Sequence, residues 1–544
     1  MDMDALGRIG KLRLMKKEMI TPNLFPVVHP VKNLIAASDL IKMGAQCIFT
    51  NAYIIYQNKE IKERILKEGI HRYLNFNGIV ATDSGAFQQY IYNNDELDIS
   101  ADEIENFQEK LNTDFAVILD IPVQLSDNFE MAKNKVLTTI ERARQNIIRR
   151  RNKNCHWFGP IHGAKYLDLI KFSAKEMSKL NFDIFAIGGL VKAFLNYRFD
   201  IVLQNLLIVK ENIIPNKPLH MFGLGLPQFF SLAVACGCDL MDSAAYILYA
   251  KEERYFTLST GTKTLEELYE FPCHCPICSK YGPQEMKSFN EELKIRLLAK
   301  HNLYISFSEL KTIRQAIRDG NLWELVELRI RNHPNLVNAV KLIKNHRPLF
   351  EIHEKIYKSH GRLYTSNEAL NRPLIYRYEK RLLANYRVPK DVKYLIILPE
   401  LDTKANSSTT IQKLLEKVNN NKIIQRELIH IVFSSEFYGL IPLELIESFP
   451  MGQYESILSS GINDLIHSNS IHKVERFFDK NYKYYNKCAV LIPENYINQF
   501  NEVINFPEDN IIYNLIPVLK SKFSENFSVF KNLKELLVFF TNGN

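Results

Sequence analysis

The chain has 544 residues, of which 46% are hydrophobic and 24% are charged, a composition that suits a globular protein of more than one domain and excludes a disordered chain. We find no apolar run of the roughly 20 residues that cross a bilayer and no signal peptide. The cysteines are few, so we expect a cytoplasmic protein that does not bind membranes. The net charge of +8 is compatible with a nucleic-acid partner but does not require one.

From residue 22 a short apolar run repeatedly ends in a polar or glycine-bearing turn, and a helical stretch follows. Most runs are apolar without alternation, as in strands buried on both faces of a parallel sheet. The eight runs are NLFPVVHP, AQCIFTNAY, GIVATDSGAF, FAVILDIP, HWFGPIHG, FAIGGL, LHMFGLG and CDLMDSAAY. The helical stretches are 58–74, one that opens at Ser100, 129–151, 168–180, 197–212 and 227–236. Eight strand–helix units predict an α/β fold, a (β/α)8 TIM-type barrel, with an open doubly wound sheet as the alternative.

Polar residues and glycines stand where these runs end. In a (β/α)8 barrel the carboxyl ends of the strands form the face that carries the active site. The residues at these ends are Asp83, Ser84, Gly85, Asp120, His162, Gly163, Gly188, Gly189, Gly223, Gly225, Asp242 and Ser243. Three carboxylates and one imidazole are therefore expected at one mouth, without further metal-type ligands beside them. This pattern favours acid–base or covalent carboxylate chemistry over metal-dependent hydrolysis.

A cysteine cluster follows the last of the eight units. Cys273, Cys275 and Cys278 form C-x-C-x-x-C, and His301 lies on the helical run after them. Three thiolates and one imidazole complete a tetrahedral zinc shell without an open position, so we expect one structural Zn²⁺ rather than a catalytic one. Two alternatives are that His274 is the fourth ligand and that the cysteines are reduced core residues.

Helical segments punctuated by Gly320 and Pro334 follow this cluster. We place the end of the barrel unit near Pro348, so residues 1–349 hold the barrel, a zinc subdomain at about 270–310 and the trailing helices. Residues 350–544 alternate strand-like and helical runs, which predicts a smaller C-terminal α/β domain.

Several motifs in order resemble the tRNA-guanine transglycosylase family: TDSGAFQ, FAVILDIP, IGGLV, FGLGLP, CDLMDSAAY and FPCHCPICS. The continuation SAAYILYAKEERYFT is similar to the archaeal branch of that family. This resemblance covers roughly residues 6–345. The stretch EFYGLIPLELIESFPMGQYE, in the C-terminal domain, is similar to a domain of the archaeal enzymes and of archaeosine synthases. We find no clear PUA domain, the tRNA-gripping domain of archaeal members, so we expect a separate PUA-domain protein or a diverged C-terminal domain.

The resemblance implies a (β/α)8 barrel with a structural zinc and a pentosyltransferase that exchanges a base in tRNA. For the archaeal branch it implies replacement of guanine at position 15 of the D-arm by 7-cyano-7-deazaguanine, the first step of archaeosine biosynthesis. It also implies a homodimer. The alternatives are a non-catalytic tRNA-binding paralogue, an archaeosine-synthase-like downstream enzyme and an unrelated zinc-structured barrel glycosidase.

The family match assigns the two catalytic carboxylates. Asp242 matches the nucleophile that attacks C1′ of the ribose, and Asp83 matches the general acid/base. Asp239 is the nearest rival of Asp242, and we interpret it as structural because the motif places the nucleophile directly before Ser243. Asp242 could instead cap a helix, and Asp83 could instead form a turn.

The match also assigns a group of residues that bind the base. Asp120 matches the carboxylate that accepts from the two adjacent N–H donors of guanine. The other members are Ser84, Phe87, His162, Gly188, Gly189 and Phe222, with the two phenylalanines stacking on the base. His162 departs from the family, which has Gln at this position, and leaves the base preference open. Outside the barrel mouth, Arg142, Arg144, Arg149, Arg150, Arg151 and Lys153 form the densest basic segment, either a tRNA contact or a solvated helix face.

Overall fold

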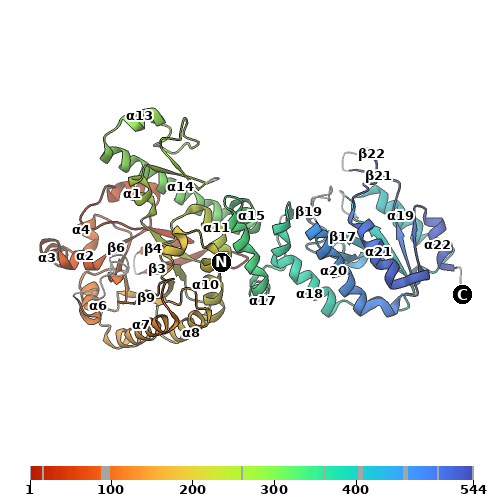
Figure 1. Cartoon of the computed structure of the whole chain (residues 1–544), viewed down its shortest axis with the longest axis horizontal. Coiled ribbons are helices and arrows are strands. Elements are labelled where there is room, and N and C mark those ends of the chain that lie inside the picture. Colours follow the sequence, from red (N-terminus) through yellow and green to blue (C-terminus); the bar gives the residue numbers. More distant parts are fainter. Residues whose placement is uncertain are drawn as a thin grey trace. The chain divides into compact units, whose positions relative to one another are not determined.

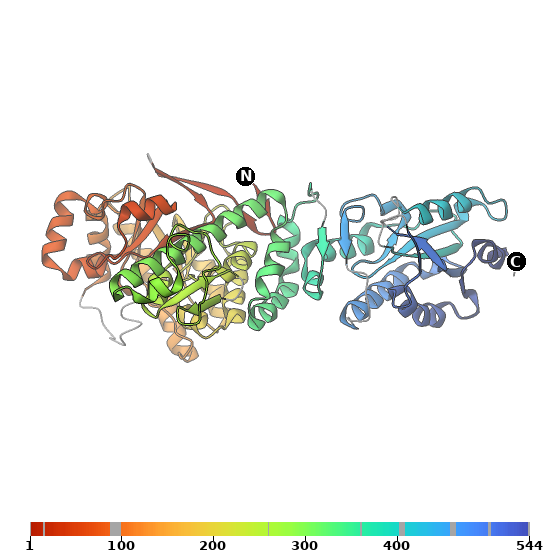
Figure 2. The same cartoon turned by 90° about the horizontal axis from the view of Figure 1, so that it is seen from above.

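The computed structural model describes residues 2–14, 17–86, 99–258, 261–359, 362–401, 408–456, 464–498 and 502–541. The chain divides into two compact units, Met1–Leu349 and Phe350–Asn544. Figures 1 and 2 show the elements of each unit from two directions. Among the described helices, none has both the length and the apolar character that crossing a bilayer would require.

The first unit is built on a ring of eight parallel strands. Their order is β5-β12-β11-β10-β9-β8-β7-β6, and a parallel bridge between Val27 and Phe49 joins the two ends of this order. The strands are β5 (Asn23–Pro26), β6 (Cys47–Asn51), β7 (Ile79–Asp83), β8 (Phe115–Val117), β9 (His156–Ile161), β10 (Ile184–Ile187), β11 (Leu219–Met221) and β12 (Leu240–Ser243). The predicted (β/α)8 barrel is confirmed, and the open doubly wound alternative is wrong.

Both faces of the barrel strands are apolar. The interior is packed with large side chains, among them Phe25, Phe49, Phe115 and Phe158, and the outer faces contact the helices. The helices of the strand–helix units are α1 (Ala37–Met43), α2 (Ala52–Gln57), α3 (Lys59–Glu68), α4 (Ile70–Leu74), α6 (Ala101–Lys110), α7 (Phe129–Arg149), α8 (Leu167–Ser178), α9 (Val191–Leu195), α10 (Phe199–Asn212), α11 (Pro227–Ala235) and α12 (Ala245–Lys251).

One predicted helix is divided in two. The sequence pattern predicts a continuous helix over 58–74, but α3 ends at Glu68 because the next residue, Gly69, has a φ of 82°, outside the helical region. Glycine adopts this conformation without the steric cost that a Cβ would add. The expected helix start at Ser100 is present, since its hydroxyl accepts the N–H of Glu103.

Two N-terminal hairpins, which the sequence analysis did not predict, precede the barrel: β1 (Met3–Asp4), β2 (Gly7–Arg8), β3 (Gly10–Leu14) and β4 (Lys17–Thr21). Leu14 and Met19 of the second hairpin pack into the barrel interior. Lys17 Nζ donates to both carboxylate oxygens of Asp114 at 2.8 and 2.7 Å, directly before β8 begins. The hairpin therefore covers the amino-terminal end of the barrel and leaves the carboxyl-terminal mouth for ligands.

The segment after the barrel connects back to its beginning. It contains β13 (Arg254–Thr257), β14 (Gly261–Thr264), α13 (Pro283–Ser288), α14 (Glu291–Asp319), α15 (Leu322–Ile330), α16 (Pro334–Val340) and α17 (Arg347–His353). Gly320 ends α14 with a φ of 71°, and Pro334 begins α16, as predicted. The N–H of Leu322 donates to Asp4 Oδ2 at 2.8 Å, and Arg314 Nη1 donates to the carbonyl of Pro22 at 2.7 Å.

The C-terminal unit holds a five-stranded sheet with the order β18-β17-β16-β20-β23, in which β18 alone is antiparallel to its neighbour. Its elements are β15 (Arg362–Tyr364), α18 (Pro373–Asn385), β16 (Tyr394–Pro399), α19 (Thr409–Asn419), β17 (Ile429–Ser435), β18 (Gly439–Pro442), β19 (Tyr454–Ser456), α20 (Asp464–Asn481), β20 (Lys487–Leu491), β21 (Asn495–Ile497), β22 (Val503–Asn505), α21 (Ile511–Phe523), β23 (Phe527–Phe530) and α22 (Leu533–Thr541). This is the smaller α/β fold that the alternating pattern predicted.

Candidate active site and metal centre

Asp83 ends β7 and is enclosed at the mouth of the barrel. Two backbone N–H groups of the following turn donate to its carboxylate, and Asn51 Nδ2 donates to Oδ2 at 3.1 Å. Burial raises the pKa of Asp83 to about 7, and the negative charges of Asp120 and Asp242 add to this shift. At neutral pH the carboxyl group is therefore populated both with and without its proton, which suits a group that must give and take protons.

Asp120 lies three residues beyond β8 and contacts His162, which directly follows β9. Nε2 of His162 lies 2.6 Å from Oδ2 of Asp120, and both side chains are almost fully buried. An ionised carboxylate only accepts hydrogen bonds, so the imidazole is the donor of this pair. A Cβ added to Gly188 would lie 2.4 Å from Cε1 of His162. Only glycine at this position leaves room for the imidazole where it lies.

Asp242 lies in β12, and its carboxylate is held by one oxygen. Nε2 of His220 lies 2.7 Å from Oδ1, and the N–H of Gly223 donates to the same oxygen at 3.2 Å. Both donors come from β11 and the turn after it. The side chain of Asp242 keeps 14% of its surface exposed, whereas that of His220 is fully buried. The carboxylate is therefore fixed but still accessible from the mouth.

The other predicted base-binding residues lie at the same end of the barrel, with one exception. Phe222 is partly exposed, and its ring centroid is 5.0 Å from that of His220. The buried hydroxyl of Ser84 donates to the carbonyl of Ile118 at 3.0 Å. Gly189 has a φ of 77°, a conformation that favours glycine. Phe87 lies outside the described residues.

Sequence reasoning missed two residues of this site, His220 and Asn51. The signal for His220 was a polar ring inside an apolar strand run, two residues before Phe222 and hence on the same side of the strand. The signal for Asn51 was its position at the end of β6, beside Asp83 in the parallel register. Neither signal identifies the partner, because the register between strands is not visible in the sequence.

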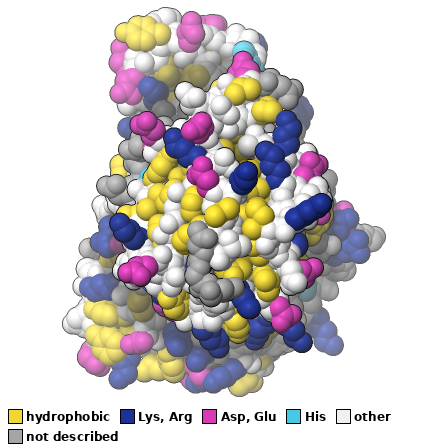
Figure 3. Space-filling view, turned by 90° about the vertical axis from the view of Figure 1, so that its right-hand side faces the viewer, with side chains coloured by type: hydrophobic (Ala, Val, Ile, Leu, Met, Phe, Trp, Pro, Cys, Tyr) yellow, Lys and Arg dark blue, Asp and Glu magenta, His cyan; other side chains and the backbone are white. Residues whose placement is uncertain are grey.

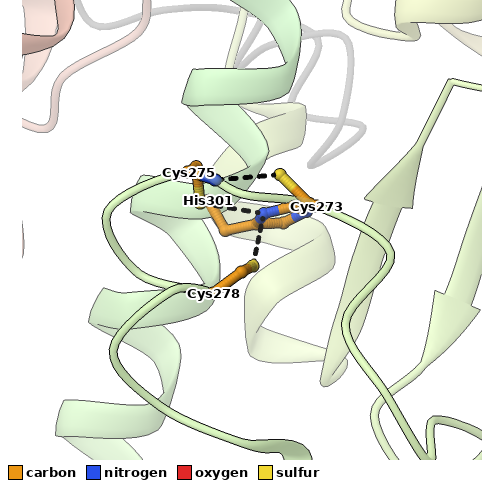
Figure 4. A group of neighbouring side chains, drawn as sticks. All are labelled: Cys273, Cys275, Cys278 and His301. Carbon is orange, nitrogen blue, oxygen red and sulfur yellow. Dashed lines mark hydrogen bonds between the residues drawn. The ribbon is translucent and has the colours of Figure 1, made fainter.

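The cysteine cluster forms a compact group of four possible metal ligands. Cys273, Cys275, Cys278 and His301 each offer one atom, and these atoms lie within 4.8 Å of one another. Figure 4 shows the three thiols facing the imidazole, which comes from α14. His274 is exposed and does not belong to the group. Of the two candidate fourth ligands, the structure therefore brings His301 to the cysteines.

The geometry of this group fits a tetrahedral metal ion. Nδ1 of His301 lies 3.5 Å from the sulfur of Cys275 and 3.3 Å from that of Cys278. Zinc bonds of about 2.3 Å to sulfur and about 2.0 Å to nitrogen place tetrahedral ligands about 3.6 Å apart. The other ring nitrogen, Nε2, lies 3.0 Å from the carbonyl of Phe256, a contact that orients Nδ1 toward the sulfurs.

The basic segment near α7 has mainly internal contacts. Among these contacts are those of Arg142 with the carbonyl of Leu119 (2.8 Å), Arg144 with Glu176 (3.0 Å), Arg149 with Glu105 (2.6 Å) and Arg150 with the carbonyl of Asn181 (2.8 Å). These four arginines therefore attach α7 to its neighbours, an arrangement that neither sequence interpretation had foreseen. Figure 3 shows a different face, on the C-terminal unit, where Lys and Arg side chains are interspersed with Asp and Glu around hydrophobic side chains.

Comparison with known families gives a match over most of the first unit. The family model described as queuine tRNA-ribosyltransferase matches residues 3–335. The chain belongs to this family. The matched residues span the barrel, the mouth with its three carboxylates and the four possible metal ligands.

Curated proteins similar to the chain are named tRNA-guanine(15) transglycosylase. The protein of Methanococcus maripaludis is 39% identical over 458 residues, which are 83% of this chain and 68% of that protein. The protein of Methanocaldococcus jannaschii is 39% identical over 459 residues, 83% of this chain and 67% of that protein. The protein of Pyrococcus abyssi is 42% identical over 378 residues, 70% and 64% of the two chains. Membership of the queuine tRNA-ribosyltransferase family makes the chain a pentosyltransferase with tRNA as substrate.

Proposed function

We propose that the protein replaces guanine at position 15 of tRNA by 7-cyano-7-deazaguanine, through a covalent intermediate between Asp242 and the ribose. The position comes from the name shared by the similar proteins, tRNA-guanine(15) transglycosylase. The proposed chemistry rests on the different environments of two carboxylates. Asp242 is fixed by its hydrogen bonds and accessible, and Asp83 has a pKa of about 7.

The reaction requires two displacements at C1′ of the same ribose. In the first, Asp242 forms a C–O bond to C1′ while the bond from C1′ to the guanine nitrogen breaks, and Asp83 gives its proton to the departing base. In the second, Asp83 takes a proton from the incoming base, whose nitrogen forms the new bond to C1′ and releases Asp242. The phosphate backbone stays intact, and the proton taken from the incoming base replaces the one that left Asp83 with guanine.

We assign base recognition to Asp120 and the residues around it. Its carboxylate accepts from the ring N–H and the amino group that guanine and its deaza analogue share. His162 keeps Nε2 on Asp120, so its contribution to base recognition goes through this carboxylate. Gly188 and Gly189 line the approach, and Phe222 with Phe87 stacks on the base. Ser84 contributes through the backbone of the turn after Asp83, because its hydroxyl is buried against the carbonyl of Ile118.

For the cysteine cluster we propose one structural Zn²⁺ held by Cys273, Cys275, Cys278 and His301. Four protein ligands fill a tetrahedral shell, so the ion supplies folding stability and no open coordination position. The family resemblance also supports a homodimer and an archaeosine-enzyme type for the C-terminal domain. Three carboxylates at one mouth argue against a non-catalytic paralogue and against an archaeosine-synthase-like enzyme.

The test is exchange of labelled guanine into an unmodified archaeal tRNA transcript by the wild type, Asp242→Asn and Asp83→Asn. We expect incorporation only by the wild type, loss of label when position 15 is changed, and release of guanine when 7-cyano-7-deazaguanine is added. Equal incorporation by Asp242→Asn would refute the covalent role. No incorporation by any protein, with or without an added PUA-domain protein, would refute the proposed activity.

A further inference from the structure

Strand β11 places an imidazole directly against Asp242. The side chain of His220 is fully buried inside the barrel. Four aromatic rings surround it at centroid distances of 5.0 to 6.1 Å: Phe222, Phe158, Phe25 and Phe49. Such an apolar enclosure disfavours a polar ring unless it makes a strong hydrogen bond. The contact with Asp242 is the bond that compensates for this burial.

The contact gives the two oxygens of the Asp242 carboxylate different environments. Oδ1 accepts from Nε2 of His220 at 2.7 Å and from the N–H of Gly223 at 3.2 Å. Oδ2 has no donor among the residues that the structure describes. Two donors on one oxygen fix the plane and the direction of a carboxylate, and the other oxygen keeps its lone pairs for a different partner.

We propose that His220 is a positioning residue for base exchange: it holds Oδ1 of Asp242 so that Oδ2 is the oxygen that attacks C1′. This inference rests on the proposed function. In the first displacement Oδ2 forms the bond to C1′, and Oδ1 becomes the carbonyl oxygen of the ester. In the second displacement the ester bond breaks, and the negative charge that returns to the carboxylate is again accepted by the donors at Oδ1.

The nature of the second ring nitrogen agrees with this assignment. Nδ1 of His220 is buried and has no hydrogen-bond partner among the described residues. The surroundings therefore offer an acceptor for only one N–H of the ring, the one on Nε2. The ring acts by donating this hydrogen bond and not by carrying protons between solvent and substrate. Another side chain that donates a hydrogen bond from the position of Nε2 should therefore substitute for His220.

The experiment compares His220→Leu, His220→Asn and His220→Gln in guanine exchange with full-length protein. Leucine has a similar volume but no donor, the amide of asparagine falls short of Oδ1, and the amide of glutamine can reach the position of Nε2. We expect kcat to fall roughly 10- to 150-fold in the leucine and asparagine variants, the effect of losing a hydrogen bond to a charged group. KM for tRNA and for guanine should stay within about twofold, and glutamine should restore kcat to within about threefold.

A matched control is His156→Leu, which removes a histidine from a pair with Asp183 at the amino-terminal end of β9. Its kcat should equal that of the wild type. Thermal unfolding of each variant shows whether it is folded. If His220→Leu does not fold, His220→Asn still tests the loss of the donor. Wild-type kcat in both donor-free variants, or a glutamine variant as slow as leucine, would overturn the positioning role. An active Asp242→Asn protein would instead refute the covalent role of Asp242, the part of the proposed function on which this inference rests.

Discussion

Gly188→Ala tests how the base-recognition pair is built. The added Cβ would lie 2.4 Å from Cε1 of His162 and 3.1 Å from its Nδ1. Carbon atoms in ordinary contact are about 3.5 to 4.0 Å apart, so the imidazole must move by roughly 1.1 Å or more. The same movement along the contact with Asp120 would lengthen it from 2.6 Å to roughly 3.7 Å, beyond hydrogen-bond range.

Two effects should follow from this movement. Overpacking of a buried site costs about 1–3 kcal/mol, so the free energy of unfolding should fall by that amount. Loss of the hydrogen bond to Asp120 removes about 1.5–3 kcal/mol from the orientation of the base-reading carboxylate. We therefore expect kcat/KM for guanine to fall by roughly one to two orders of magnitude. Exchange kinetics at varied guanine concentration and a denaturant titration measure the two effects.

The control for Gly188→Ala is Gly282→Ala, where a Cβ would meet nothing within 4 Å and φ is −87°. This variant should leave both measurements unchanged. A double-mutant cycle then isolates the contact: in a His162→Ala background, Gly188→Ala should have no further effect on kcat/KM. Equal effects of Gly188→Ala with and without the imidazole would refute the steric reasoning.

Two further predictions concern protons and metal. Because Asp83 has a pKa of about 7 and must be protonated to release guanine, formation of the covalent intermediate should slow tenfold per unit above pH 7 in single-turnover measurements, and any residual first step of Asp83→Asn should lack this dependence. A rate that rises above pH 7 would contradict the acid role. Cys275→Ser should lose bound zinc and several degrees of Tm, whereas a stable, zinc-free and active protein would exclude a structural ion.

The barrel was predictable because its strands follow a simple physical rule. Runs such as FAVILDIP are apolar on both faces, and only a sheet covered on both sides accommodates eight of them. The same rule placed Asp83, Asp120 and Asp242 at one mouth, since parallel strands end at one face. The metal ligands were predictable from their spacing, but the choice between His274 and His301 required α14.

The contacts between strands were not predictable from the sequence. His220 and Asp242 are 22 residues apart and meet only because β11 pairs with β12 in a particular register. In the sequence, the arginines of α7 resemble a charged surface segment, because their hydrogen-bond acceptors, such as Glu105, lie on other elements. The hairpin β3–β4 was missed because each strand has only five residues, and the polar–apolar alternation of β3 does not continue through β4.

The links between the first and last elements of the first unit have a consequence for the synthesis of the chain. Asp4 meets its partner Leu322 across 318 residues, and β5 needs β12 to pair on one side. At about 5–20 residues per second, a ribosome takes roughly 15–60 s to make that intervening chain. The edge of β5 stays unpaired until β12 has emerged, and the contact of Asp4 waits for α15, so we expect the nascent protein to expose apolar surface, a substrate for chaperones, for most of this time.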